Sequence, residues 1–221
     1  MNKTIKAILF DLDNTLINFS EFKKRATKAA ARAMKNAGLV GETREIEKNL
    51  IEFYFRHGIE SDDAFQKFLE KQTGRVEYRI LAAGVNAYLK EKYRHLEPYP
   101  GTIETLEGLR DKNYKLGIVS DGLRLKAWMR LVESGLDEFF QVVVTYDDTG
   151  EQKPSEKPFL KACGELGVEP HDCLFVGDWP ERDILGAGRA GMKTCLALYG
   201  GYEGEADYVI GDIRELLKLL D

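Results

Sequence analysis

Residues 7–18 read AILFDLDNTLIN, and this stretch sets the expectations for the rest of the chain. Its first four residues form an apolar run that is typical of a buried strand. Two carboxylates, Asp11 and Asp13, follow the run one residue apart. Ionised carboxylates this close repel each other and are costly to remove from water. The pair therefore indicates a bound cation, or a shared proton, at the end of the strand.

The composition is that of a globular protein, because 221 residues that are 43% hydrophobic can bury a sizeable core. The net charge of -5 is spread without a basic block, which argues against nucleic acid as the main partner. No stretch approaches the ~20 apolar residues of a membrane-spanning helix, and the first apolar run is too short for a signal peptide. We therefore expect a soluble, cytoplasmic protein without a membrane partner. The oligomeric state is not indicated.

The three cysteines, Cys163, Cys173 and Cys195, stand far apart in the sequence and form no C-x-x-C pair. The three histidines are equally scattered. We therefore interpret these residues as ordinary thiols and imidazoles, and expect neither a zinc site nor a disulfide framework.

Six short apolar segments predict the strands of a parallel sheet. They are residues 6–10, 115–120, 141–145, 173–177, 194–198 and 207–211. From Pro98 onward, amphipathic stretches alternate with these segments, which predicts right-handed βαβ crossovers with helices on both faces. Those stretches cover residues 101–112, 122–134, 155–167, 181–190 and 212–220. The expected fold class is α/β, with a doubly wound, Rossmann-like parallel sheet.

Residues 20–95 differ, since they carry helical periodicity almost throughout. Apolar positions at helical spacing are Phe22, Ala26, Ala29, Ala33 and Ala37 in one stretch, and Tyr78, Leu81, Val85, Tyr88 and Leu89 in another. Breaks near Gly41, Gly58 and Gly74 would divide the region into about four helices. Prolines at 98 and 100 cannot continue a helix. We therefore expect residues 1–17 and 98–221 to form an α/β core and residues 18–97 an inserted all-helical domain.

The ligand site of a doubly wound sheet lies beyond the carboxyl ends of its strands. Polar residues follow four of the predicted strands: Asp11, Asp13 and Thr15 after the first, Ser120 and Asp121 after the second, Lys153 after the third, and Asp178 and Asp183 after the fourth. Together these groups would cradle a divalent cation and a phosphate.

Phosphoryl transfer needs a nucleophile held in line, compensation of the phosphoryl charge and a proton for the leaving oxygen. Asp11 can be the nucleophile if a hard cation removes its repulsion from the phosphate, and Mg²⁺ suits carboxylate ligands. Asp11 and Asp178 are candidate ligands, while Asp183 is a further ligand, an orienting neighbour or an N-terminal helix charge. Asp13 can exchange the proton. Lys153 adds a fixed positive charge.

The ordered set of groups resembles the haloacid dehalogenase superfamily, specifically its phosphatase-like branch. The resemblance rests on four elements in the family's order: D-x-D-x-T at Asp11–Thr15, Ser120 at a strand end, K-P at Lys153–Pro154, and G-D-x-x-x-x-D at Gly177–Asp183. Lys157 is also followed by proline, but Phe159 gives Lys153 the family's K-P-x-x-x-x-F spacing. With the helical insertion, the similarity spans essentially the whole chain.

The resemblance implies a role for each matching residue. Asp11 would be the nucleophile, and Asp13 the general acid/base that also lends its backbone carbonyl to the metal. Ser120 and Lys153 would bind the phosphate, and Asp178 and Asp183 would complete the Mg²⁺ site. Apart from the resemblance, the amide of Asp121 follows Ser120 in the same turn, so we expect it to contact the phosphate as well. The inserted helices would be the family's cap, which closes over the site. Phe19, Phe22 and Lys23 lie where the chain leaves the site, so we expect them to influence substrate choice.

The sequence thus predicts a Mg²⁺-dependent phosphatase that acts on a small phosphorylated metabolite through phospho-Asp11. Three alternatives stay open. A 2-haloacid dehalogenase is disfavoured by Asp13, because a leaving halide needs no proton. A phosphomutase would have to protect phospho-Asp11 from water, and a non-catalytic phosphate-binding scaffold would have no need of all four motifs. The sequence does not indicate which metabolite is the substrate.

Overall fold

The computed structural model describes residues 5–57 and 63–220 of the chain. These residues divide into two compact units. One unit comprises the N-terminal segment through Asn18 together with the chain from Glu97 onward, and the other comprises Phe19–Leu96. We call the first the α/β unit and the second the helical unit. The expected helix break near Gly58 lies outside the described residues.

The α/β unit is built on a six-stranded sheet in the order β3-β2-β1-β4-β5-β6, and every strand pairing is parallel. The strands are β1 (Ala7–Phe10), β2 (Lys115–Val119), β3 (Val142–Val144), β4 (Cys173–Gly177), β5 (Lys193–Ala197) and β6 (Tyr208–Ile210). All residues of β1 and β4 are buried, as expected for central strands of a sheet that is covered on both faces. The predicted α/β class with a Rossmann-like sheet is confirmed.

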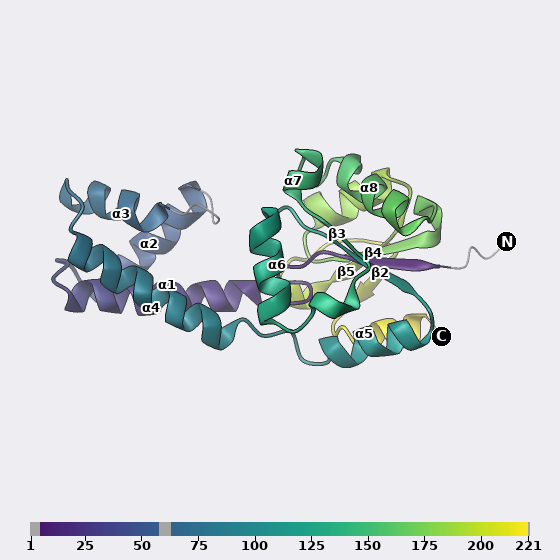
Figure 1. Ribbon diagram of the computed structural model, residues 1–221, viewed down its shortest axis with the longest axis horizontal. Helices are drawn as coiled ribbons and strands as arrows, with labels where there is room; N and C mark the ends of the chain where they lie inside the picture. The colour runs from purple at the N-terminus through teal and green to yellow at the C-terminus, as the bar shows by residue number, and fades with distance from the viewer. Residues whose placement is uncertain (1–4, 58–62, 221) are drawn as a thin grey trace. The chain divides into compact units, whose positions relative to one another are not determined.

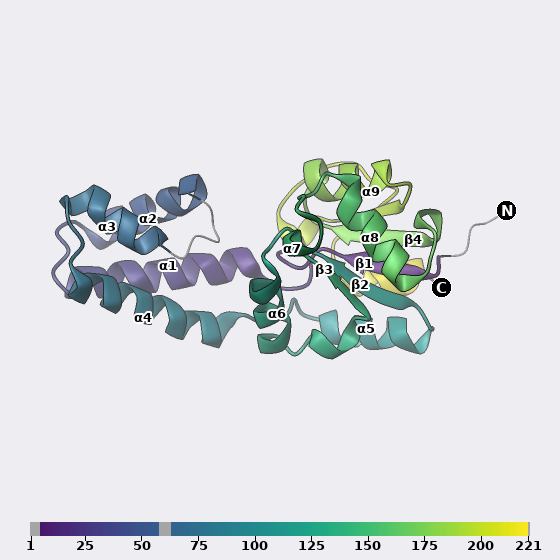
Figure 2. The same cartoon turned by 45° about the horizontal axis from the view of Figure 1, so that its top comes forward.

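Helices cover both faces of this sheet, with α8 and α9 on one face and α5 and α10 on the other (Figures 1 and 2). The helices of the unit are α5 (Thr102–Asp111), α6 (Arg124–Glu133), α7 (Tyr146–Thr149), α8 (Glu156–Leu166), α9 (Leu185–Arg189) and α10 (Glu215–Leu219). The predicted helix at 181–190 is instead a π-helical turn, Pro180–Ile184, followed by α9. Such turns often mark functional positions.

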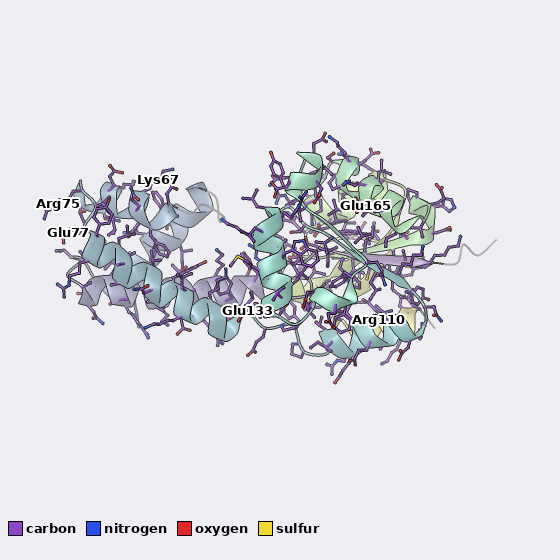
Figure 3. The ribbon with its side chains drawn as sticks, viewed as in Figure 1. Lys67, Arg75, Glu77, Arg110, Glu133 and Glu165 are labelled. Carbon is purple, nitrogen blue, oxygen red and sulfur yellow. The ribbon has the colours of Figure 1, made fainter. Side chains whose placement is uncertain are left out.

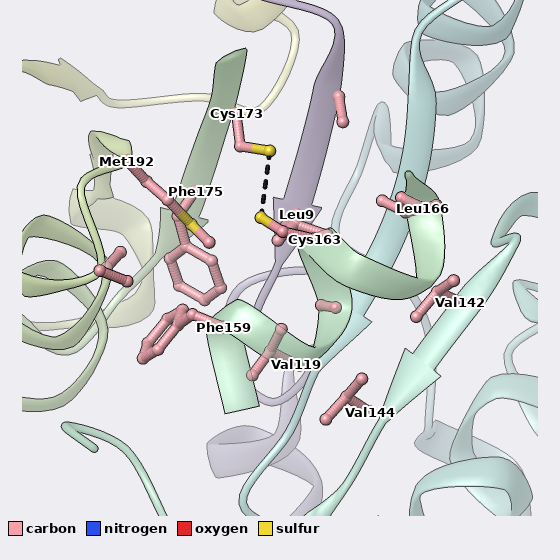
Figure 4. Packing of buried hydrophobic residues seen from close by; sticks show 14 residues of the cluster. Leu9, Val119, Val142, Val144, Phe159, Cys163, Leu166, Cys173, Phe175 and Met192 are labelled. Atoms are coloured by element: carbon pink, nitrogen blue, oxygen red, sulfur yellow. Dashed lines mark hydrogen bonds between the residues drawn. The ribbon is translucent and has the colours of Figure 1, made fainter. Parts of the chain in front are cut away.

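The packing between α8 and the sheet forms a dense apolar cluster (Figure 4). Phe159 of α8 meets Phe175 of β4 edge to face, with ring centroids 4.9 Å apart. Cys163 of α8 and Cys173 of β4 are free buried thiols whose sulfurs lie 3.3 Å apart, although they are ten positions apart in the sequence. This packing fixes α8, and with it the preceding loop that carries Lys153, against the central strands.

The helical unit consists, in its described part, of α1 (Phe19–Asn36), α2 (Thr43–His57), α3 (Ala64–Thr73) and α4 (Tyr78–His95). The expected apolar stripe on α4 is correct only in part. Tyr88 of the stripe is buried, but Tyr78 is 72% exposed and Leu89 is also exposed, while the buried Ile80 lay outside the prediction. The reason is a close contact between α1 and α4, because a side chain at Gly84 would collide with Met34. The helix therefore turns its glycine side, and not the Tyr78 side, toward α1.

Charged side chains lie on the outside of both units (Figure 3). Examples are Lys67, Arg75 and Glu77 on the helical unit, and Arg110, Glu133 and Glu165 on the α/β unit. Among the residues that the structure describes, no helix combines the length and the apolar character needed to cross a bilayer.

Candidate active site

The turn after β1 sets the positions of Asp11 and Asp13. The amide of Asp11 donates to the Val176 carbonyl at 2.9 Å, so Asp11 still follows the sheet. Asn14 then takes a left-handed conformation with φ 63°, which asparagine tolerates better than most residues. The Asn14 amide donates to the Ile17 carbonyl at 2.8 Å and closes the turn. Two carboxylates are thereby held just beyond the sheet.

Three carboxylates meet at this edge, one from the turn after β1 and two from the segment after β4. Asp11, Asp178 and Asp183 each offer one oxygen, and these oxygens all lie within 4.8 Å of one another. All three residues are buried. Asp178 Oδ1 accepts from the Thr15 hydroxyl at 3.4 Å, while Asp178 Oδ2 is buried without a hydrogen-bond partner among the described residues. A buried, unbonded carboxylate oxygen beside two further carboxylates fits the oxygen ligand set of a hard cation.

Lys153 supplies a positive charge to this cluster. Its Nζ atom pairs with Asp11 and, at 2.7 Å, with Asp183 Oδ1. Burial of the ammonium disfavours its charge, but the neighbouring carboxylates outweigh that effect and keep the pKa of Lys153 above its usual range. Lys157, the other lysine that precedes a proline, pairs with Glu151 at 3.1 Å on the exposed side of the loop. The structure therefore places Lys153, and not Lys157, among the carboxylates.

The acidic cluster carries more negative charge than Lys153 can balance. Burial raises the pKa of Asp11 well above its usual range, and the attraction of Lys153 only partly offsets this effect. Burial and the nearby Asp183 likewise raise the pKa of Asp178 to about 7. Three carboxylates face one ammonium, so two negative charges remain when all three are ionised. A divalent cation would supply the missing charge.

The turn after β2 is joined to the segment that carries Lys153 by the side chain of Asp121. The amide of Ser120 donates to the Val144 carbonyl at 2.9 Å, and the Ser120 hydroxyl accepts from the Gly122 amide at 3.2 Å. The carboxylate of Asp121 accepts from the Lys153 amide at 2.8 Å and pairs with Arg182 at 3.2 Å. A carboxylate would repel a phosphate, so only the backbone of Asp121 suits the predicted phosphate contact.

Asp13 has a charged partner that the sequence reasoning missed. Arg130 of α6 donates through Nη1 to Asp13 Oδ2 at 2.7 Å, and its side chain is only 6% exposed. One sequence signal for this residue exists, because Arg130 falls at helical spacing with the buried Ala127 and Leu131. That signal is weak, since the exposed face of the same helix is also rich in apolar residues.

The loop after β5 forms a second contact that the sequence did not reveal. At Gly200, an added Cβ would lie 2.2 Å from the Asp178 Cβ and 2.7 Å from the Asn14 carbonyl oxygen. The neighbouring Tyr199 donates its hydroxyl to the Thr15 carbonyl at 3.0 Å. This loop therefore packs directly against the acidic cluster, and only glycine fits at position 200.

The predicted specificity residues lie together in the helical unit. The Lys23 ammonium donates to the Tyr88 hydroxyl at 2.7 Å. It also lies 5.1 Å from the ring centroid of Phe19 and 5.6 Å from that of Phe22, within the range of cation–π attraction. These contacts fix Lys23 within an aromatic cluster of its own unit. The role of Phe19, Phe22 and Lys23 in substrate choice stays a prediction.

Comparison with known proteins places this geometry in a family. The family model described as haloacid dehalogenase-like hydrolase matches residues 8–197. The glyceraldehyde 3-phosphate phosphatase of Methanopyrus kandleri is 38% identical over 98% of this chain and 97% of its own. The phosphoglycolate phosphatase of Aquifex aeolicus is 34% identical over 98% of this chain and 97% of its own.

A solved structure agrees with the sequence matches. The crystal structure of a HAD phosphatase from Thermococcus onnurineus superposes with a TM-score of 0.73, at 31% identity, and covers 98% of each chain. The sheet order, the strand-end carboxylates and these matches lead to the same assignment. The chain therefore belongs to the haloacid dehalogenase-like hydrolase family, as one of its phosphatases that hydrolyse phosphoric monoesters.

Proposed function

We propose that this protein is a Mg²⁺-dependent phosphatase that hydrolyses small phosphorylated metabolites through an aspartyl-phosphate at Asp11. The observation that carries the proposal is the cluster of three buried carboxylates around a single ammonium. When all three carboxylates are ionised, the cluster lacks two positive charges, and the buried Oδ2 atom of Asp178, which has no hydrogen-bond partner among the described residues, is suited to a metal. We propose Asp11, Asp178, Asp183 and the backbone carbonyl of Asp13 as the residues that hold Mg²⁺.

The first half of the reaction transfers the phosphoryl group to Asp11. A carboxylate oxygen of Asp11 attacks phosphorus while the bond from phosphorus to the ester oxygen breaks, and Asp13 gives its proton to the departing oxygen. Lys153, the Ser120 hydroxyl and the amides of the turn after Ser120 bind the phosphoryl oxygens. When bound, Mg²⁺ would neutralise charge between the Asp11 carboxylate and the phosphate.

The second half of the reaction restores the enzyme. Asp13, now ionised, takes a proton from a water molecule, and the water oxygen attacks phosphorus. The bond between phosphorus and the Asp11 oxygen breaks, inorganic phosphate leaves, and Asp13 is protonated again. Asp11 and Asp13 thus have separate tasks, although only one residue lies between them.

The proposed substrates are phosphorylated two- and three-carbon compounds. The similarity to proteins named glyceraldehyde 3-phosphate phosphatase and phosphoglycolate phosphatase supports this class. We further propose that residues 18–97 act as a cap, in which Phe19, Phe22 and Lys23 contribute to substrate choice. The helical content and separate packing of residues 19–96 are compatible with that role.

The test of the mechanism is turnover of 4-nitrophenyl phosphate with and without Mg²⁺. Asp11→Asn should abolish turnover, and undiminished activity of that variant would exclude phospho-Asp11. Asp13→Asn should still bind Mg²⁺ but lose turnover, whereas Asp178→Asn should weaken Mg²⁺ binding itself. Acid-quenched wild-type enzyme should carry one phosphoryl group on Asp11, as read by peptide mass spectrometry.

The test of the substrate class is a Mg²⁺-supplemented screen against phosphorylated two- and three-carbon acids and aldehydes, sugars and nucleotides. We expect the highest kcat/KM among the smallest esters. Preference for sugar or nucleotide phosphates would reject this class while leaving the mechanism intact. Chloride release from a 2-chloro acid, or isomerisation of a hexose 1-phosphate, would replace the phosphatase proposal by a dehalogenase or a mutase.

A further inference from the structure

A buried arginine contacts the proposed general acid. Arg130 lies in the last turn of α6 and is 5% exposed, and its Nη1 atom donates to Asp13 Oδ2 at 2.7 Å. Arginine is rarely buried to this extent unless it is paired, because the guanidinium must give up its water. The pair joins residues that are 117 positions apart in the sequence. α6 is thereby tied to the turn after β1.

The same guanidinium also borders the turn after β2. A Cβ added at Gly122 would lie 3.3 Å from Arg130 Nη1 and 3.4 Å from the Ser120 hydroxyl oxygen. The nitrogen that holds Asp13 is therefore close to the turn that we propose binds the phosphoryl oxygens. α6 begins at Arg124, only two residues after Gly122, so the turn and the arginine belong to one continuous segment. Arg130 can thus fix the distance between the acid and the phosphoryl group.

We infer that Arg130 is a positioning residue, which holds the Asp13 carboxylate in line with the leaving oxygen; the inference rests on the proposed phosphatase function. Arg130 itself forms no bond to the substrate. Its contribution is to limit the orientations of Asp13, so that the proton passes to the ester oxygen as the bond to phosphorus breaks. General acid catalysis depends on such placement, and displacement by about 1 Å can cost roughly 10²-fold in rate.

This role predicts a dependence on the leaving group that a merely structural ion pair would not produce. Nitrophenolate departs readily without a proton, whereas the departure of phenolate depends more strongly on protonation of the ester oxygen. Phenyl phosphate and 4-nitrophenyl phosphate have nearly the same shape, so the ratio of their kcat/KM values isolates proton transfer in the first half of the reaction. For Arg130→Gln, we expect kcat/KM for phenyl phosphate to fall roughly 10²-fold. The fall in kcat/KM for 4-nitrophenyl phosphate should be about tenfold or smaller. KM should change little.

Three variants control the experiment. Arg124→Gln removes an exposed ion pair with Asp148 from the same helix and should leave both kcat/KM values unchanged. Arg130→Lys keeps the charge and should recover part of the activity toward phenyl phosphate, and it carries the test if Arg130→Gln does not fold. In an Asp13→Asn background, Arg130→Gln should cause no further loss, because both changes remove the same step.

The outcomes separate this inference from the proposed function. Equal losses for both esters, in variants whose circular dichroism matches the wild type, would overturn the positioning role. An additional loss in the Asp13→Asn background would also overturn it, because Arg130 would then act independently of Asp13. If the wild-type enzyme with Mg²⁺ turns over neither ester nor any metabolite of the screen, the proposed function itself fails.

Discussion

Removal of Mg²⁺ should make the folded protein less stable as the pH rises toward neutrality, with Asp178 as a main cause. Burial and the neighbouring Asp183 raise the pKa of Asp178 from 3.8 to about 7. Between these two values, the folded protein retains a proton that the unfolded chain has already released. The free energy of unfolding must then fall as the pH rises, which is opposite to the effect of a carboxylate whose pKa is lowered by folding. The contribution of Asp178 to the free energy of unfolding is fully present below about pH 4 and is lost progressively up to about pH 7.

The pKa values set the size of this effect. At about 1.4 kcal/mol for each pKa unit, a rise from 3.8 to about 7 corresponds to a loss of about 4 kcal/mol at most. The actual loss should be on the order of 2 to 4 kcal/mol, because Asp178 titrates together with its neighbours and not as an isolated group. Asp11 acts in the same direction, since burial raises its pKa as well. If Mg²⁺ binds the folded protein alone, as we propose, it should restore about 2.7 kcal/mol at roughly 100 times its Kd.

Urea unfolding measures this prediction directly. Wild-type protein in a chelator should have a lower free energy of unfolding at about pH 8 than at about pH 5, and excess Mg²⁺ should offset most of that difference. The matched variant is Asp178→Asn, which keeps the shape of the side chain but cannot ionise. Without metal at about pH 8, this variant should be more stable than the wild type, and it should respond weakly to Mg²⁺.

Two results would contradict this prediction. One is a metal-free wild-type protein that is equally stable at both pH values, because the buried carboxylates would then be ionised at no cost. The other is an Asp178→Asn variant with the same pH dependence as the wild type. In that case the pH-dependent loss of stability would arise from another carboxylate of the cluster.

Three further substitutions test other parts of the site. Gly200→Ala should weaken Mg²⁺ binding measured by calorimetry and lower kcat roughly 10²-fold, because the new methyl group displaces Asp178. The control variant Gly188→Ala has open space around its Cβ and should change neither quantity. Lys153→Gln leaves two buried carboxylates without their ion pair and should cost about 3 to 5 kcal/mol of metal-free stability in urea at neutral pH; a loss below about 1 kcal/mol would contradict the pairing. Lys23→Ala should change kcat/KM unequally across a panel of phosphate esters, and a uniform panel would show that Lys23 is not a selector.

Strand positions were predictable because each buried strand is a short apolar run with polar ends. The predicted segment 173–177 coincides with β4, and 194–198 differs from β5 by one residue at each end. The buried side of α4 was predicted only in part, since Tyr88 was included but Ile80 and Gly84 were not. Its contact with α1 depends on Gly84, which has no side chain, so an apolar-periodicity argument gives that position no weight.

The candidate site shows the same division between local and long-range information. Asp11 and Asp178 follow adjacent parallel strands, and parallel strands bring their carboxyl ends to one edge, so their meeting could be predicted from order alone. Arg130 reaches Asp13 from the last turn of α6, and Gly200 contacts Asp178 across a loop. Neither contact follows from position in a strand or from a motif, because each depends on how a surface element packs in three dimensions.

Two charges of opposite sign in the site stand at the ends of two elements that pack against each other in the core. Asp178 directly follows β4, and Lys153 lies just before α8. Apolar packing between Phe159 of α8 and Phe175 of β4 fixes those elements relative to each other (Figure 4). The separation of the charges is therefore set by the core and not by the ligands, so little reorganisation is needed when a metal or phosphate binds. The core must also hold the carboxylates together against their repulsion, which is why the metal-free protein should lose stability on ionisation while the site keeps its geometry.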